Sequence, residues 1–192
     1  MDPRNLRSVI DYRIFWLSLS EEEQEDWLHP DFISAFYPFW EHLVDRAREA
    51  AEKFAISYRG FKVGCAVLAY SHKIALATGV GVAGYKVFIG YNIKPQEGEG
   101  PNIHAEEIAL FAAREEGYDT IIAITIVGET QADQQSGLIT PNLHICGRCR
   151  LLLSSMPEVK NATIILLAHF NDGICEIMEF EELIIRHAMV QK

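Results

Sequence analysis

Two short motifs bring together residue types that bind transition metals, His104-Ala105-Glu106 and Cys146-Gly147-Arg148-Cys149. A catalytic zinc ion takes three protein ligands and keeps a fourth position open for water. His104, Cys146 and Cys149 can supply the three ligands. Two thiolates and a neutral imidazole together carry two negative charges, which a zinc ion would balance. The motifs therefore predict Zn2+ as a cofactor, held in a site with an open position.

Glu106 is the expected catalytic residue. It lies two residues from His104, so the two side chains should not share one helical face and Glu106 should not be a fourth ligand. A carboxyl group beside a zinc site can take a proton from water and deliver it to a substrate. This role gives the open position a purpose, because zinc acidifies the water that it binds.

A Cys-x-x-Cys motif alone has other uses. It can be a redox pair, but the arrangement typical of thioredoxin-like proteins, just after an early strand, is absent here. It can also belong to a closed structural zinc site, for which His144 would be the fourth ligand. Glu106 would have no purpose in a closed site, so a catalytic site is favoured and His144 is expected in a loop. Arg148 and Arg150 can either hydrogen-bond the thiolates or face solvent, and the sequence leaves both open.

The elements that must position these motifs follow from hydrophobic periodicity. Apolar residues at helical spacing predict helices over 38–55, 104–116, 146–154 and 181–189. Apolar and β-branched runs predict strands at 63–70, 73–80, 87–92, 121–127, 162–168 and 174–178, with 73–80 as the hairpin partner of 63–70. Strands that alternate with helices indicate a three-layer α/β/α sandwich. Both motifs fall at predicted helix starts, where the positive end of the helix favours thiolate over thiol.

The chain divides into an extension and a domain. Residues 1–35 are predicted to form a helical N-terminal extension, because Ser20 and Glu23 make a capping box before an acidic helical run. Residues 36–192 are predicted to form the catalytic domain. In its helices, Ile108, Phe111 and Ala112 share one face, and Leu151, Leu152 and Leu153 are expected to point toward the core.

Composition and charge disfavour several classes of protein. The 192 residues carry a net charge of −10 with scattered Lys and Arg, so nucleic acid is an unlikely partner. Early charged residues argue against a signal peptide, and apolar runs such as 121–127 are too short to cross a bilayer. We therefore expect a soluble cytoplasmic protein with no membrane partner. Cys65 and Cys175 lie on predicted strands and are expected to be inert core residues.

From about residue 38 to its end, the chain resembles the nucleoside-type branch of the cytidine deaminase superfamily. The segment 57–66 is similar to that family's Tyr-x-x-Phe-x-Val-Gly-Ala-Ala strand, and Gly90-Tyr91-Asn92 is similar to its Gly-x-Asn element. His104-Ala105-Glu106 and Cys146-Gly147-Arg148-Cys149-Arg150 resemble its zinc elements, and the second also resembles that of blasticidin-S deaminase. A His-x-Glu element with a later Cys-x-x-Cys is typical of zinc deaminases.

The resemblance implies a fold, a reaction and a set of substrate contacts. The fold would contain a mixed five-stranded sheet. The reaction would be a zinc-dependent hydrolysis that converts an aminopyrimidine, as a cytidine- or deoxycytidine-like nucleoside or a related compound, to the oxo form with release of ammonia. Phe61 would line the base pocket, Asn92 would bind a sugar hydroxyl and Ala105 would offer backbone contacts to the base. The resemblance also implies a homo-oligomer, either a dimer or a tetramer.

Some positions depart from the family pattern. Lys94 stands where the family usually has a ribose-binding Glu, and a cation cannot accept a hydrogen bond from a hydroxyl. Lys94 would instead meet an acidic or phosphorylated group. Ile145 replaces the usual Pro before the first Cys, and Glu107 stands where members with a third cysteine ligand often carry Arg. An alternative function is therefore kept, a non-catalytic zinc-binding protein of the deaminase fold that acts as a binding module.

Overall fold

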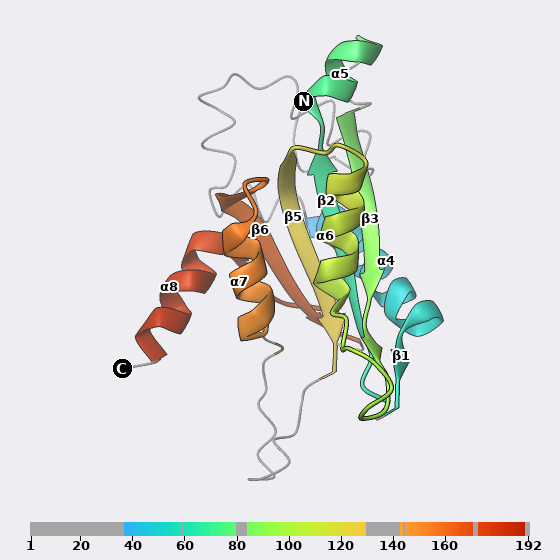
Figure 1. The fold of residues 1–192 in the computed structure, drawn as a ribbon. Helices are drawn as coiled ribbons and strands as arrows, with labels where there is room; N and C mark the ends of the chain where they lie inside the picture. Colours follow the sequence, from blue (N-terminus) through green and yellow to red (C-terminus); the bar gives the residue numbers. More distant parts are fainter. Residues whose placement is uncertain are drawn as a thin grey trace.

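A mixed five-stranded sheet lies at the centre of the molecule (Figure 1). The computed structural model describes residues 37–58, 60–79, 84–129, 143, 145–170 and 173–190. Within them the strand order is β3 (Tyr85–Tyr91), β2 (Val63–Tyr70), β5 (Thr120–Gly128), β6 (Val159–His169) and β7 (Gly173–Glu179). Strands β5 and β6 are parallel, and the other neighbouring pairs are antiparallel. The expected mixed sheet is confirmed.

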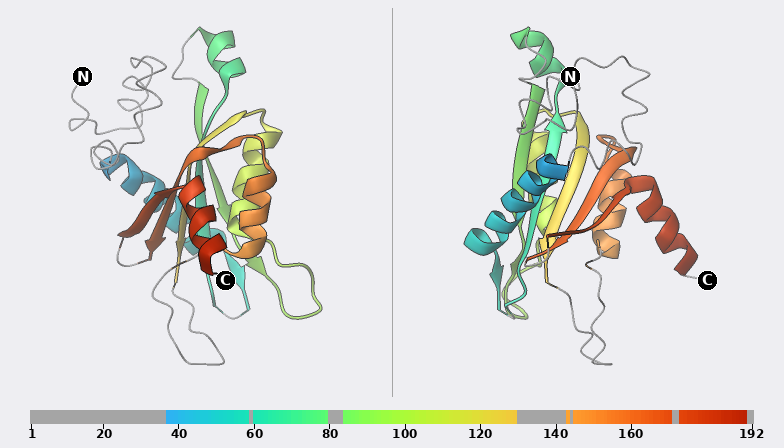
Figure 2. Two further views of the ribbon diagram at one scale, coloured as in Figure 1. Left: turned by 90° about the vertical axis from the view of Figure 1, so that its left-hand side faces the viewer. Right: turned by 180° about the vertical axis from the view of Figure 1, so that it is seen from behind.

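Helices cover both faces of this sheet (Figures 1 and 2). One face is covered by α4 (Tyr37–Phe54), which packs mainly against β2, β3 and β5. The other face carries α6 (Ala105–Glu115), α7 (Gly147–Ser155) and α8 (Phe180–Val190). This is the expected three-layer arrangement. None of the described helices combines the length and apolar character that a membrane span requires.

Strand β2 shows why its sequence is apolar without alternation. Cys65, Val67 and Ala69 are buried on the face that carries α6, whereas Ala66 and Leu68 are buried toward α4. A strand covered on both sides needs apolar residues at every position. Cys65 is fully buried, as expected, while the side chain of Cys175 lies outside the described part of the chain.

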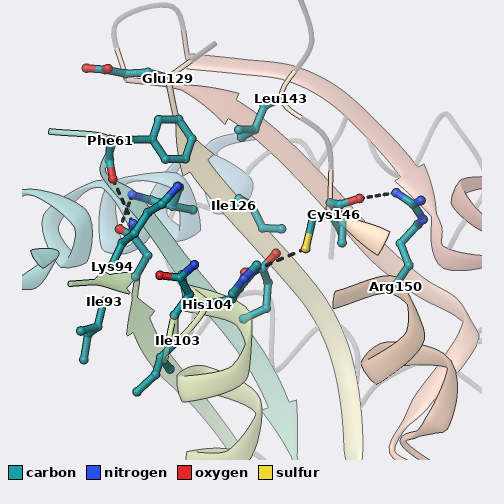
Figure 3. A pocket seen from close by; sticks show the side chains of 16 residues that line it. Phe61, Ile93, Lys94, Ile103, His104, Ile126, Glu129, Leu143, Cys146 and Arg150 are labelled. Carbon is teal, nitrogen blue, oxygen red and sulfur yellow. Dashed lines mark hydrogen bonds between the residues drawn. The ribbon is translucent and has the colours of Figure 1, made fainter. Parts of the chain in front are cut away.

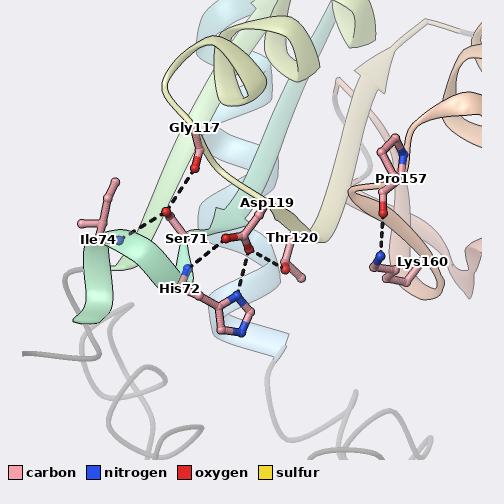
Figure 4. A network of polar contacts seen from close by, with 8 residues as sticks. All are labelled: Ser71, His72, Ile74, Gly117, Asp119, Thr120, Pro157 and Lys160. Carbon is pink, nitrogen blue, oxygen red and sulfur yellow. Dashed lines mark hydrogen bonds and ion pairs between the residues drawn. The ribbon is translucent and has the colours of Figure 1, made fainter. Parts of the chain in front are cut away.

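The predicted strand over 73–80 is wrong. Helix α5 (His72–Thr78) occupies this segment and ends at Gly79, which has a φ of 64°. The buried Ser71 begins the helix, because its hydroxyl donates to the Gly117 carbonyl at 3.1 Å and accepts from the Ile74 N–H at 3.4 Å (Figure 4). The local bond to Ile74 caps the first helical turn, and the long-range bond to Gly117 holds the cap in place, which favours a helix over an extended strand. The antiparallel partner of β2 is instead β3.

One further detail of the helices differs from expectation. Leu151 is 73% exposed, so its predicted core position is wrong, whereas Leu153 is fully buried. On α6, Phe111 is 45% exposed and Ile108 and Ala112 are half-buried, so the face that these three residues share is only partly covered. The core face of α6 is formed by small residues and one leucine, Ala105, Ala109, Leu110 and Ala113.

A short two-stranded ladder lies beside the segment that leads into His104. Strands β1 (Ile56–Ser57) and β4 (Ile93–Lys94) pair in parallel. Ile93 also bridges to Ile103, which brings the segment before α6 against β4. The predicted extension over 1–35, residues 130–142 and His144 lie outside the described residues, and the division into an extension and a domain remains a prediction.

Candidate metal centre and active site

The two predicted metal-binding motifs meet at the starts of two neighbouring helices. His104 immediately precedes α6, and Cys146 immediately precedes α7. Helix α6 leads into β5 and α7 leads into β6, and these two strands are parallel neighbours. Both helices therefore begin beyond the carboxyl ends of their strands, where ligand sites of α/β folds usually form.

The three proposed ligand atoms form one compact group. The His104 Nδ1 atom lies 3.3 Å from the Cys146 Sγ atom and 3.2 Å from the Cys149 Sγ atom. All three atoms lie within 4.8 Å of one another. Zinc–nitrogen and zinc–sulfur bonds of usual length place such atoms about 3.6 Å apart in a tetrahedral site. The donor set and its spacing therefore fit a zinc ion with three protein ligands.

Hydrogen bonds fix the two ligand segments. The Cys146 Sγ atom accepts a hydrogen bond from the Cys149 N–H at 3.4 Å, which starts helix α7. The Glu107 carboxylate accepts from the His104 N–H at 2.8 Å, which starts helix α6. Arg148 pairs with Glu107 at 2.6 Å, and Arg150 donates to the Ile145 carbonyl at 2.5 Å. Arg148 thus pairs with a carboxylate and Arg150 with a backbone carbonyl, and these partners differ from the thiolates considered in the sequence analysis.

Glu106 is buried beside the ligand group. The residue is 5% exposed, and its carboxyl group lies near the side chains of His104 and Cys149. Burial raises the pKa of Glu106, while a backbone hydrogen bond and the nearby His104 oppose this rise. A carboxyl group with a raised pKa can both hold and release a proton nearer to neutral pH.

Burial also raises the pKa of the Cys149 thiol, and the Glu106 carboxylate adds to the effect. The protein without metal therefore favours the thiol form of Cys149. Metal binding must displace this proton, so it couples to pH. Cys65, directly in the core, has its thiol pKa raised by burial and by Glu106, which fits an inert residue.

One cavity of about 340 Å³ opens onto this group (Figure 3). Its size lies in the usual range for small-molecule sites. The predicted site residues that line it are Phe61, Asn92, Lys94, His104, Ala105, Glu106 and Cys146. Cys149 is fully buried behind the wall. Asn102, Ile126, Glu129 and Arg150 also line the cavity. Sequence reasoning assigned none of these four to the pocket, since the first three belong to no motif and Arg150 was considered only as a partner of the thiolates or a solvent-facing residue.

Asn92 has backbone partners at both ends of its amide. Its oxygen accepts from the Val63 N–H at 2.8 Å, and its nitrogen donates to the Phe61 carbonyl at 2.9 Å. It therefore ties the end of β3 to the segment that enters β2. One N–H and one oxygen lone pair remain for a further contact.

Gly90 explains how α6 approaches the sheet. A Cβ atom at this position would lie 2.0 Å from the Ala105 carbonyl oxygen and 2.8 Å from the Ala109 nitrogen. Only a residue without a side chain leaves room for the first turn of α6. Since this turn carries Glu106 and follows His104, Gly90 helps to set how closely Glu106 and His104 approach the sheet.

Comparison with known proteins agrees with this geometry. A family model described as the cytidine and deoxycytidylate deaminase zinc-binding region matches residues 39–164. The fold resembles a cytidine deaminase from Burkholderia pseudomallei, with a TM-score of 0.53, 26% identity, and coverage of 74% of this chain and 93% of that chain. A mutant cytidine deaminase from Mycobacterium tuberculosis has a TM-score of 0.49 at 22% identity, covering 75% of this chain and 90% of that one. The cytidine deaminase from Mycobacterium leprae has a TM-score of 0.48 at 20% identity, covering 75% of this chain and 95% of that one. A comparison with curated proteins gives no match. The family match covers the ligand group and most of the strands and helices described above, and it shows that the chain belongs to the cytidine and deoxycytidylate deaminase family.

Proposed function

We propose that this protein is a zinc-dependent hydrolytic deaminase. Its substrate would be an aminopyrimidine, as a cytidine- or deoxycytidine-like nucleoside or a related compound, and its products would be the oxo compound and ammonia. One observation carries the proposal: a buried carboxyl group, Glu106, lies beside a His-Cys-Cys group on the wall of one small-molecule cavity.

His104, Cys146 and Cys149 would hold the zinc ion. Zinc bound there would acidify a water molecule and so supply the nucleophile. Glu106 would accept the proton of that water, because its carboxyl group lies beside the ligands and faces the cavity. It would then give this first proton to the ring nitrogen of the substrate, and it would later carry a second proton, taken from the hydroxyl group added to the ring carbon, to the amino group that departs as ammonia. Its raised pKa suits this exchange, since the acid and base forms must both be reached in each turnover.

The cavity wall would recognise the rest of the substrate. Phe61 would pack against the base, and the Ala105 backbone would hydrogen-bond to it. The remaining N–H of the Asn92 amide would donate to a sugar hydroxyl. Lys94, on the short strand β4, would bind an acceptor or an anionic group. A substrate with a phosphate or another acidic group fits this position better than a neutral one.

A second candidate is a non-catalytic zinc protein that uses the deaminase fold to bind a partner. Asn92 favours it, because much of this amide's bonding capacity serves the backbone of Phe61 and Val63. Lys94 favours it too, since it replaces a carboxylate that the resemblance led us to expect.

A substrate screen separates the two candidates. Purified protein would be assayed with cytidine, deoxycytidine, cytosine, their phosphates where these exist and blasticidin S, by ultraviolet absorbance and ammonia release. We expect deamination of at least one compound, together with about one zinc ion per chain. Zinc without turnover on any aminopyrimidine would favour the non-catalytic protein, and a chain without zinc would contradict both.

A further inference from the structure

One ion pair joins the two segments that carry the metal ligands. The Glu107 Oε1 atom lies 2.6 Å from the Arg148 Nη2 atom, and the Glu107 side chain is only 11% exposed. The other carboxylate oxygen of Glu107 accepts from the His104 N–H at 2.8 Å. Glu107 therefore bonds at once to the backbone of a proposed ligand and to a residue between the two proposed cysteine ligands.

Arg148 makes a second contact across the same junction. Its Nη1 atom donates to the Asn102 carbonyl at 3.3 Å. Asn102 lies on the segment that leads into His104, and both residues line the cavity. One guanidinium group thus holds the start of α7 against two points of the chain around the start of α6.

We infer that Glu107 and Arg148 are positioning residues that keep His104 in place against Cys146 and Cys149. The inference rests on the proposed zinc site, and it assigns to this pair the preassembly of that site. A short hydrogen bond between charged groups, with one partner largely shielded from water, is stronger and more directional than an exposed pair. Partners that orient metal ligands in this way commonly contribute about 10- to 100-fold to metal affinity or activity.

Helix α6 offers a matched comparison at its other end. Arg114 donates two hydrogen bonds to Glu158, at 2.9 and 2.7 Å. This pair also crosses between elements of the fold, but it contacts neither ligand segment. Its loss should therefore affect stability without affecting the metal.

The experiment measures the rate at which zinc-loaded protein releases zinc to an excess of a chromophoric chelator. The variants are Arg148→Ala, Glu107→Gln, the double variant and the control Arg114→Ala. Glutamine keeps an oxygen that can accept from the His104 N–H, so Glu107→Gln removes the ion pair but not the helix cap. We expect zinc release to be about tenfold faster in each single variant than in the parent protein. The double variant should release zinc at the same rate as the single variants, because the two residues act as one unit.

Further readouts separate positioning from general stability. Arg114→Ala should release zinc at the parent rate, although its unfolding temperature should fall about as much as that of Arg148→Ala. Arg148→Lys should restore part of the zinc retention, because it keeps one charged contact but not both. On a substrate from the screen, Arg148→Ala should lower kcat more than it raises KM.

Several outcomes would overturn the inference. Parent-like zinc release from both single variants would overturn it alone, with the proposed function intact. Additive effects in the double variant, or equally fast release from Arg114→Ala, would also overturn it. A parent protein that holds no zinc would overturn both the proposed function and this inference.

Discussion

Glu106 lies buried beside two thiols and an imidazole, and this environment sets its chemistry. We expect Glu106→Gln to keep zinc but to lower kcat by about 10²- to 10⁴-fold, the usual contribution of a general acid or base. The amide fills the same space but cannot take a proton. Turnover would be followed by ultraviolet absorbance, and zinc content would be measured on the same sample.

The same variant should not cost stability in the metal-free protein. Because burial raises the folded pKa of Glu106 above 4.5, the metal-free protein loses stability as the pH rises from 4.5 through the folded value. Glutamine has no charge to bury, so the metal-free variant should unfold at the parent temperature or higher at neutral pH. Normal turnover in Glu106→Gln would contradict its proposed role, whereas a collapse of stability would show that the residue is structural.

Lys94 is the position where the substrate preference should change. We expect Lys94→Glu to lower kcat/KM about 10- to 100-fold for any substrate with an anionic group near this position, which is the range for losing a hydrogen bond to a charged group. The kcat/KM for neutral nucleosides should rise relative to the kcat/KM for the anionic substrate. The measurement is the ratio of kcat/KM for a nucleoside and its phosphate.

Lys62→Glu is the matched control for this change in charge. Lys62 donates to the Glu52 carbonyl at 3.3 Å and does not line the cavity. Both variants change the net charge by the same amount. An equal shift in preference from both variants would mean that the overall charge, rather than a contact from Lys94, selects the substrate.

At the scale of elements, the approach of α6 to β3 depends on Gly90. We expect Gly90→Ala to destabilise the protein by about 1 to 3 kcal/mol, as is usual for overpacking, because its Cβ atom would meet backbone atoms that cannot move alone. Gly147→Ala is the control, since a Cβ atom there would come no closer than 3.7 Å to its nearest neighbour, Arg150. Thermal unfolding of both variants tests this, and equal stability would show that α6 can shift freely.

The contact between Arg114 and Glu158 predicts a pH dependence. The hydrogen bonds from Arg114 lower the pKa of Glu158 below its ordinary value of 4.5. The stabilisation is therefore present above pH 4.5 and is lost as the pH falls through the lower folded value. Arg114 is 41% exposed, so water and salt screen the pair and its contribution should be about 1 kcal/mol or less.

The test compares the parent with Arg114→Ala by thermal unfolding over a range of pH. Their difference should be largest near neutral pH and should vanish well below pH 4.5. A difference that stays constant over this range would mean that the Arg114 side chain stabilises the fold by packing rather than by charge.

The elements that sequence patterns predicted well are those with strong periodicity or two-sided burial. Strand β2 matches its predicted bounds, and α4 and α7 differ from theirs by about a residue at each end. Helix α5 could not be predicted from its apolar residues, because the contacts of Ser71 with Gly117 and of His72 with Asp119 come from a distant turn (Figure 4). The two proposed ligand motifs could be identified from the sequence, because each is a short local run of residues. The Glu107–Arg148 pair was not, because only the parallel pairing of β5 and β6 brings those residues together.

At the scale of the whole molecule, we propose a homo-oligomer, as the family resemblance suggests. Phe111 on α6 and Leu151 on α7 expose 45% and 73% of their surface, although both are large and apolar. We expect light scattering to give the mass of a dimer or a tetramer rather than the 21.7 kDa of one chain. Gel filtration over a range of concentrations is the control. A monomer with full activity would contradict this proposal.

The order of elements along the chain also has a consequence for synthesis on the ribosome. His104 leaves the exit tunnel well before Cys146 and Cys149, and the two segments meet only when β6 pairs with β5. A nascent chain therefore cannot bring its three donors together in the native arrangement until β6, which ends at His169, has emerged. Metal uptake would then come late and would report that the central sheet has closed in its native register.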